Sequence, residues 1–157
     1  MLNFNFKNYL ETVIFLINSN FQYVMIFNMS DKVIVTGGAG FIGHILVKYI
    51  LDNTDWEVVS IDRLDYSGNL NRFSHMLKDY DEATKKRVKI IYHDLKSEVN
   101  NLLESQIRDV KHIFHLAASS HVDRSITEPM TFVYDNVVAT GNLLNYSRNL
   151  DNLETLV

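Results

Sequence analysis

The residues of this sequence that could carry chemistry gather in one short stretch, HLAASSHVDRSI, from His115 to Ile126. Two histidines, three serines, an aspartate and an arginine lie there close together, directly after an apolar run. Such a group is typical of a metal site, of a serine-nucleophile site, or of the rim of a ligand pocket. The strands and helices that position this stretch indicate which of these three sites it forms.

The spacing of these residues argues against the metal and the nucleophile. His112 and His115 lie three apart on a predicted strand, so their side chains point to opposite faces. The sequence has no cysteine to complete a thiolate site. A serine-histidine-aspartate centre within residues 119–123 would need near neighbours to converge, and the sequence lacks the GxSxG turn that exposes a nucleophilic serine. We therefore expect no metal and favour the rim of a ligand pocket.

A glycine-rich turn, TGGAGFIG at residues 36–43, holds four of the six glycines. It follows a predicted strand and opens a predicted helix, and it contains both G-x-G-x-x-G and G-x-x-G-x-x-G. In that context Gly37 lets the chain turn sharply, Gly40 lets backbone N–H groups approach a pyrophosphate, and the last glycine lets the helix pack tightly. The positive end of the helix dipole would face the phosphates. The turn predicts a dinucleotide site.

An acidic residue, Asp62, closes the next predicted strand. A carboxylate at this position accepts hydrogen bonds from the ribose hydroxyls of adenosine and repels a 2′-phosphate, so it favours NAD over NADP. Arg63 follows directly and weakens this exclusion, because its guanidinium could reach a 2′-phosphate if Asp62 turned aside. NAD is the cofactor that the sequence predicts.

These segments lie between short apolar strands and amphipathic helices that alternate along the chain. Periodicity predicts strands at Lys32–Thr36, Glu57–Ile61, Val88–Tyr92 and His112–Leu116, and a fifth near Leu153. It predicts helices at Phe41–Asp52 and Asn69–Tyr80, one capped by Ser97, and one that begins at Pro129. The alternation indicates an α/β fold: a Rossmann-type parallel sheet with helices on both faces, incomplete at about four to five strands.

The buried faces of the helices are predicted from apolar residues three and four apart. In the first helix this set is Ile42, Ile45, Leu46, Tyr49 and Ile50. In the helix after Ser97 it is Val99, Leu102, Leu103 and Ile107. In the last helix it is Met130, Val133, Val137 and Leu144, with Gly141 on the same face.

Composition bounds the class of protein. The hydrophobic share is 46%, the charged share is 22% and the net charge is −4, as in a soluble globular protein. Lys and Arg do not cluster, so we expect neither a nucleic-acid partner nor a membrane surface. The absence of cysteine fits a reducing compartment such as the cytoplasm. A chain of 157 residues has room for one domain.

The first 28 residues are rich in Phe and Asn, unlike the rest. Their best apolar run is too short to span a bilayer, and they lack the features of a secretory signal. We interpret residues 1–28 as an N-terminal extension that is disordered or results from an early start codon. The domain then covers residues 29–157, with Met29 as the natural start.

Further motifs follow the glycine turn in a fixed order: residues 62–70 (DRLDYSGNL), 93–95 (HDL), 115–129 (HLAASSHVDRSITEP) and 136–144 (NVVATGNLL). In this order they resemble the extended short-chain dehydrogenases that modify nucleotide sugars. The closest resemblance is to the dTDP-glucose 4,6-dehydratases, followed by the UDP-glucose 4,6-dehydratases. It extends from about Lys32 to the end, and HVDRSI is its most discriminating part, because sugar epimerases usually lack that run.

The resemblance implies roles for individual residues. In the cofactor site, Gly37, Gly40, Phe41 and Ile42 would face the pyrophosphate, and Asp62, Arg63, Leu64 and Asp65 would surround the adenosine ribose. Asp94 and Leu95 would flank the adenine, and Leu116, Ala117, Ala118, Ser119 and Ser120 would line the nicotinamide side. Ser120, His121 and Arg124 would contact the nucleotide-sugar substrate. In the reaction, a tyrosine base helps NAD to take hydride from C4 of the glucose, water leaves across C5 and C6, and the hydride returns to C6.

The sequence departs from the family's pattern at three positions. Ser119 stands where the family usually has Glu, Asp135 where it has Thr, and Ala139 where it has Gly. Asp65 resembles the UDP-glucose branch, which leaves the substrate open between dTDP-glucose and UDP-glucose.

The family's catalytic Tyr-x-x-x-Lys pair is expected after the fifth strand, beyond the last residue of this sequence. The one literal match, Tyr92 to Lys96, is not expected to act, because the spacing places two residues together only on a helix and Tyr92 ends a strand. We therefore expect no catalytic residue here, and interpret the chain as the truncated NAD-binding N-terminal portion of a dehydratase, inactive alone. Alternatives are a UDP-sugar 4-epimerase or decarboxylase of the same family, or a non-catalytic nucleotide-binding module. Relatives tend to dimerise through long helices, which makes residues 129–150 a candidate homodimer surface.

Overall fold

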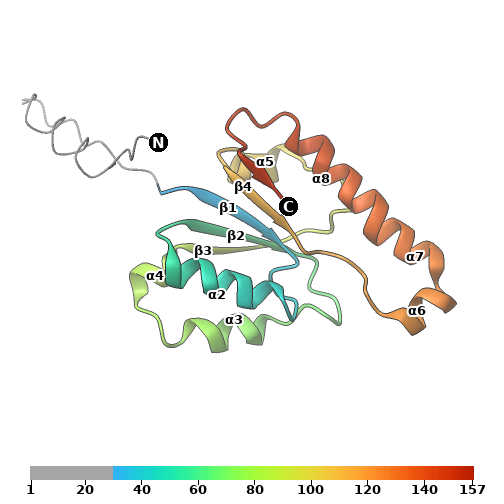
Figure 1. Ribbon diagram of the computed structural model, residues 1–157, viewed down its shortest axis with the longest axis horizontal. Helices are drawn as coiled ribbons and strands as arrows, with labels where there is room; N and C mark the ends of the chain where they lie inside the picture. Colours follow the sequence, from blue (N-terminus) through green and yellow to red (C-terminus); the bar gives the residue numbers. More distant parts are fainter. Residues whose placement is uncertain (1–29) are drawn as a thin grey trace, which may run out of the picture.

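The computed structural model describes residues 30–157, so the predicted extension at 1–28 lies outside the described residues. The described chain forms a five-stranded sheet in the order β3-β2-β1-β4-β5 (Figure 1). Its strands are β1 (Lys32–Thr36), β2 (Glu57–Asp62), β3 (Val88–Tyr92), β4 (His112–His115) and β5 (Thr155–Leu156). All neighbouring strands are parallel. The chain builds outward from β1 to β3 and then crosses to the other side of β1, which is the Rossmann-type arrangement that the sequence predicts.

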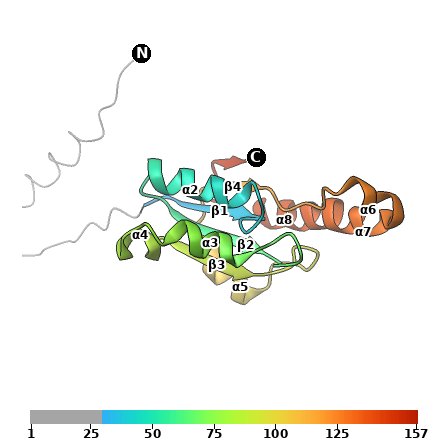
Figure 2. The same cartoon turned by 90° about the horizontal axis from the view of Figure 1, so that it is seen from below.

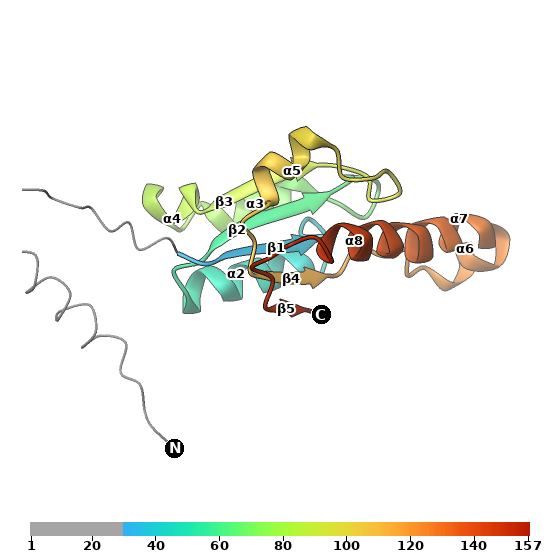
Figure 3. The ribbon, with the colours of Figure 1, turned by 90° about the horizontal axis from the view of Figure 1, so that it is seen from above.

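Helices connect the strands and cover both faces of the sheet, as views from below and from above show (Figure 2, Figure 3). They are α2 (Gly43–Asn53), α3 (Leu70–Leu77), α4 (Glu82–Lys86), α5 (Asn101–Ile107), α6 (Val122–Thr127), α7 (Pro129–Val133) and α8 (Ala139–Ser147). A turn of π-helix, η1 (Tyr134–Val138), joins α7 to α8. Within residues 30–157 none of these helices has the length and apolar character that crossing a bilayer requires.

Strand β1 is buried on both faces, and its side chains alternate between two cores. Val33 and Val35 belong to the core shared with α2 and α3, whereas Ile34 belongs to the core shared with α5 and α8. A strand that helices cover on both sides needs an apolar residue at each buried position, which explains the continuous run VIV at residues 33–35.

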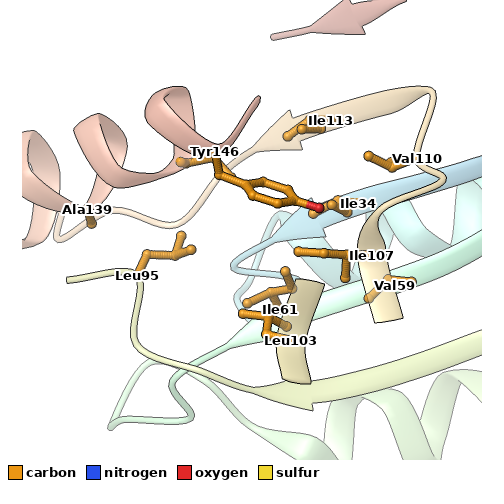
Figure 4. Packing of buried hydrophobic residues seen from close by; sticks show 11 residues of the cluster. Ile34, Val59, Ile61, Leu95, Leu103, Ile107, Val110, Ile113, Ala139 and Tyr146 are labelled. Atoms are coloured by element: carbon orange, nitrogen blue, oxygen red, sulfur yellow. The ribbon is translucent and has the colours of Figure 1, made fainter. Parts of the chain in front are cut away.

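The core on the α5 and α8 side contains Tyr146, whose ring lies among Ile34, Val110 and Ile113 (Figure 4). Burial raises the pKa of Tyr146 to about 12. The hydroxyl of Tyr146 is buried without a hydrogen-bond partner among the described residues. The ring therefore acts here as an apolar side chain.

Helix α2 begins at Gly43 rather than at Phe41, and its predicted buried face is partly wrong. Ile45 and Tyr49 are exposed, while Gly43, Val47, Ile50 and Leu51 are buried. The reason is the contact at Gly43, where a Cβ would lie 2.2 Å from the carbonyl oxygen of Gly37. That contact turns the Gly43 side of the helix toward the sheet, and residues four, seven and eight positions later follow it.

The segments before β3 and β4 also differ from their predictions. The helix expected at 69–80 ends at Leu77, and the short helix α4, which was not predicted, follows it. The N-cap of α5 is Asn100, whose side chain accepts a hydrogen bond from the backbone N–H of Leu103 at 2.9 Å, and not Ser97. The backbone N–H of Ser97 instead donates to Asp94 in the turn after β3. Leu102, predicted to be buried, is 74% exposed.

Helix α7, the π turn η1 and helix α8 form one long helical segment. It begins at Pro129 as predicted, but its predicted buried face is wrong. Met130, Val133, Val137 and Leu144 are exposed. The buried residues are instead Asp135, Ala139, Leu143, Tyr146 and Ser147. Two features explain the difference: α6 and α7 project past the carboxyl end of the sheet (Figure 1, Figure 3), and the wider π turn shifts the helical phase between α7 and α8.

Candidate functional site

The glycine turn lies between β1 and α2 and touches two neighbouring strands. Gly37 has φ +68°, a backbone conformation that residues with a side chain rarely adopt. A Cβ on Gly37 would also lie 2.8 Å from the backbone nitrogen of Ala117. Its own N–H donates to the carbonyl oxygen of Ile61 at 2.8 Å. These contacts place the turn directly beside the carboxyl ends of β2 and β4, where open α/β sheets bind ligands.

A cleft that is partly open to solvent lies at these strand ends. Its lining comes from the glycine turn, from the segments that follow β2, β3 and β4, and from the long helical segment. The lining residues are Gly37, Gly40, Ile61, Asp62, Arg63, Asp65, Ser67, Gly68, His93, Asp94, Leu95, Leu116, Ala117, Ala118, Ser119, Asp135 and Ala139.

Asp62 closes β2 at the floor of this cleft. One carboxylate oxygen accepts a hydrogen bond from the backbone N–H of Ala39 at 3.0 Å, and the other accepts from that of Leu64 at 2.8 Å. Leu64 has φ +54°, a strained conformation for leucine that aims its N–H back at the carboxylate. Each oxygen of a carboxylate can accept a second hydrogen bond, so Asp62 keeps the capacity to bind ribose hydroxyls.

Arg63 crosses the cleft to the helical segment. Its Nη1 and Nη2 donate to the two carboxylate oxygens of Asp135 at 2.6 and 2.8 Å, and its Nε donates to Asp65 at 2.8 Å. The pKa of the Asp135 carboxyl is held well below its usual range, chiefly by the hydrogen bonds from Arg63. Ser119 adds a hydrogen bond from its hydroxyl to Asp135 at 2.6 Å.

Lys96 extends this network from the turn after β3. Its Nζ lies 3.1 Å from Oδ1 of Asp135 and 3.4 Å from Oδ2 of Asp94. Asn142 of α8 donates to the carbonyl oxygens of Leu95 and Lys96, both at 2.9 Å. The segment predicted to flank adenine is therefore tied to the helical segment by polar contacts.

His115 is a structural residue in this fold. Its Nδ1 lies 2.7 Å from the hydroxyl of Thr36 and its Nε2 lies 2.8 Å from the hydroxyl of Thr140. The Thr140 hydroxyl donates to the carbonyl oxygen of Asn136, so Nε2 carries the proton and Nδ1 accepts from Thr36. Burial lowers the pKa of His115, as expected for a neutral imidazole that joins β1, β4 and α8.

A second cluster lies outside the cleft at the start of α6. The ring of Tyr66 faces the guanidinium of Arg124 at 4.6 Å, and its hydroxyl lies 3.0 Å from Nδ1 of His121. Two of the residues predicted to contact substrate, His121 and Arg124, are thus brought together by Tyr66, which the sequence did not single out.

The predicted cofactor residues divide into those that line the cleft and those that do not. Phe41 and Ile42 are exposed beside the glycine turn, outside the lining, and Ser120 is exposed beyond it. The side chain of Leu64 packs against the core of α2 and α3. The other predicted cofactor residues all line the cleft: Gly37, Gly40, Asp62, Arg63, Asp65, Asp94, Leu95, Leu116, Ala117, Ala118 and Ser119.

Sequence reasoning did not assign Ile61, Ser67, Gly68, His93, Asp135 or Ala139 to the cleft. Asp135 and Ala139 gave one signal, since both depart from the family's usual residues. The literal Tyr92 to Lys96 match lies at the end of β3 and in the turn after it, so the two residues do not share a helix. Within residues 30–157, no group of three or more histidines and carboxylates is arranged to hold a metal ion.

Comparisons with known proteins fit this geometry. A family model described as GDP-mannose 4,6 dehydratase matches residues 34–156. The chain belongs to this family. It is 41% identical over 119 residues to a dTDP-glucose 4,6-dehydratase of Salmonella typhimurium, a match that covers 74% of this chain and 31% of the relative. The chain thus spans about a third of the length of such curated dehydratases.

Solved structures of nucleotide-sugar dehydratases and epimerases have a similar fold. A dTDP-glucose 4,6-dehydratase of Streptomyces venezuelae, determined with NAD and TYD bound, is 34% identical with a TM-score of 0.63, and the match covers 78% of this chain and 37% of that one. A UDP-N-acetylglucosamine 4-epimerase of Methanobrevibacter ruminantium, in complex with UDP-N-acetylmuramic acid, is 31% identical with a TM-score of 0.62. That match covers 78% of this chain and 35% of the epimerase.

Proposed function

We propose that residues 30–157 form the NAD-binding portion of a nucleotide-sugar 4,6-dehydratase, a lyase that converts dTDP-glucose or UDP-glucose to the 4-keto-6-deoxy sugar. The observation that carries the proposal is that the glycine turn and Asp62 line one cleft at the carboxyl ends of parallel strands. A dinucleotide needs both, because its pyrophosphate lies at a helix N-terminus and its adenosine ribose meets an acid at the next strand.

The residues present fit NAD. Gly37 and Gly40 would admit the pyrophosphate, and Asp62 would accept hydrogen bonds from the ribose. Ala117 and Ala118 carry small side chains that leave room for the nicotinamide. When bound, NAD would supply the acceptor for a hydride from the sugar. The proposal assigns binding and positioning to these residues and no catalytic step.

The substrate side of the proposal rests on Ser120, His121 and Arg124, which lie past the nicotinamide end of the cleft. Ser120 and His121 are exposed, and Arg124 is half-buried against the ring of Tyr66, so all three are accessible to a nucleotide sugar. A 4-epimerase is the second candidate, because an epimerase of this fold is 31% identical to the chain. A decarboxylase of the same family would use the same cofactor portion.

The proposal also covers self-association and cellular location. A second copy of the chain would pack on the exposed apolar side of the long helical segment, where Met130, Val133 and Val137 lie. A cytoplasmic location is compatible with a sequence of 157 residues without cysteine.

Isothermal titration calorimetry of the whole chain with NAD tests the cofactor. We expect Asp62→Asn to weaken NAD binding about tenfold or more, because it removes the charge from hydrogen bonds worth roughly 1.5–3 kcal/mol. Asp55→Asn is the matched control, since Asp55 is exposed in the turn between α2 and β2 and lies outside the cleft. A folded wild-type chain without affinity for NAD, or equal losses in the two variants, would contradict the proposal.

A further inference from the structure

The guanidinium of Arg63 is held at three of its nitrogens by carboxylates. Nη1 and Nη2 form a bidentate pair with Asp135, and Nε donates to Asp65. Bidentate pairs of this kind are the strong and geometrically specific form of an arginine-carboxylate contact. The side chain is therefore fixed in one direction, across the cleft toward η1.

Asp135 is built to hold this arginine. It is 5% exposed, and besides Arg63 it accepts a hydrogen bond from Ser119 and pairs with Lys96. If Arg63 turned away, it would leave a buried carboxylate with two hydrogen bonds fewer, and an undercompensated buried charge is costly. The geometry therefore favours the crossed position of Arg63 over any other.

The position of Arg63 in the chain gives this arrangement a consequence for cofactor choice. It directly follows Asp62, and an arginine near the acid at the end of the second strand is the group that accommodates the 2′-phosphate of NADP in dinucleotide sites. Here that arginine points to η1. The four carboxylates of Asp62, Asp65, Asp94 and Asp135 also outnumber the two cations Arg63 and Lys96 at this end of the cleft.

Ser119, in the segment after β4, also fixes the acceptor of Arg63, because its hydroxyl donates to Asp135 at 2.6 Å.

We propose that Asp135 is a specificity-determining residue, which holds Arg63 across the cleft and so withholds it from a 2′-phosphate. The inference rests on the proposed NAD site and adds to it a second source of selectivity, independent of the repulsion by Asp62. Removal of the Asp135 charge frees Arg63 to reach the ribose end and removes one negative charge from it.

The test is calorimetric titration of the whole chain with NAD and with NADP. We expect Asp135→Asn to raise the affinity for NADP relative to NAD by about tenfold or more, the range of one charge-assisted hydrogen bond. The double variant R63Q/D135N should lose that gain, because the gain requires the guanidinium. The exchange variant S119E/D135T moves the acid to position 119, which Arg63 already reaches at 3.5 Å, and should keep the wild-type preference.

The outcomes separate the two proposals. A wild-type chain that binds NAD, combined with a D135N variant whose NADP to NAD ratio is unchanged, overturns the role of Asp135 alone. A folded wild-type chain that binds neither nucleotide overturns the NAD site and this inference with it. A gain that persists in R63Q/D135N also overturns the inference, since it would then come from charge and not from Arg63.

If D135N does not give a cooperative thermal melt, D135T replaces it, since Thr also removes the charge and keeps a polar group. The wild-type chain provides a measurement without any substitution. In ¹⁵N-detected spectra of the arginine side chains, the Nε resonance of Arg63 should respond equally to saturating NAD and NADP. A shift specific to NADP would show that Arg63 already reaches the phosphate and would overturn the inference.

Discussion

The imidazole of His115 joins three elements through two threonine hydroxyls, and its protonation state follows from those contacts. Thr36 donates to one ring nitrogen and Thr140 accepts from the other, so an added proton would meet a ring nitrogen whose lone pair is already used. Burial also lowers the pKa of His115, because it removes water from around the charged form of the ring. A residue that the sequence places in a dense chemical cluster thus serves to hold the cleft together.

This lowered pKa predicts a pH dependence of stability. In the unfolded chain His115 takes up a proton near pH 6.5, whereas the folded chain resists it. The stability that neutral His115 supplies is present above about pH 6.5 and is lost as the pH falls below it. We expect the melting temperature to fall less steeply between pH 7.5 and 5.5 in His115→Gln than in the wild-type chain.

The control is His75→Gln, which removes an exposed histidine of α3. Equal slopes for the wild-type chain and His115→Gln, with the control also unchanged, would exclude the linkage. Asp135 does not interfere in this window. Its pKa is lowered from an ordinary value near 3.8, so its contribution is present above that pH and is lost only in stronger acid.

At the scale of elements, two helical glycines have opposite surroundings and predict opposite effects. A Cβ at Gly43 of α2 would lie 2.2 Å from the carbonyl oxygen of Gly37, whereas a Cβ at Gly141 of α8 would meet nothing within 4 Å. We expect Gly43→Ala to destabilise the chain by about 1–3 kcal/mol, as overpacking does. Gly141→Ala should stabilise it by about 0.5–1 kcal/mol, because alanine loses less backbone entropy in a helix.

Urea unfolding at constant pH measures both changes, and each variant is the control for the other. Gly43→Ala should also weaken NAD binding, since the clash displaces the glycine turn, while Gly141→Ala should not affect it. A Gly43→Ala chain as stable as the wild type would show that α2 can move away from the turn without cost.

The strands were predictable from the sequence, and the helix faces were not. A strand such as β1 shows its environment directly, because a run of β-branched residues is expected only where both sides are covered. The faces of α2 and of the long helical segment depend on the contact of Gly43 with the turn and on the π-helical register. Both are tertiary features, so apolar periodicity pointed to Tyr49 and Val137, which are exposed.

The same distinction holds for the candidate site. The glycine turn and Asp62 were predictable because each is a local motif with a fixed position after a strand. The pair of Arg63 with Asp135 was not, since the two residues lie 72 positions apart and meet only when β2 and η1 reach one end of the sheet. Local sequence identifies the fold and the cofactor class, whereas the network that tunes the cleft needs the assembled molecule.

In the assembled protein, α6 and α7 extend past the sheet, and together with η1 and α8 they present an apolar surface (Figure 3). Met130, Val133, Val137 and Leu144 are spaced along that surface at helical intervals. Exposed apolar surface of this kind marks an interaction site, and a second copy of the same helix would offer a self-complementary partner.

We therefore expect the chain to self-associate and Val137→Lys to shift it toward the monomer. Val137 is 64% exposed in the single chain, and a partner helix would bury the lysine charge at this position. Sedimentation velocity over a range of protein concentrations measures this shift. Leu102→Lys is the matched control, since Leu102 is equally apolar and exposed but lies on α5. A concentration-independent monomer of the wild-type chain would contradict the self-association. An equal effect of both lysines would place the association surface elsewhere, because only contact through the helical segment makes position 137 more sensitive than position 102.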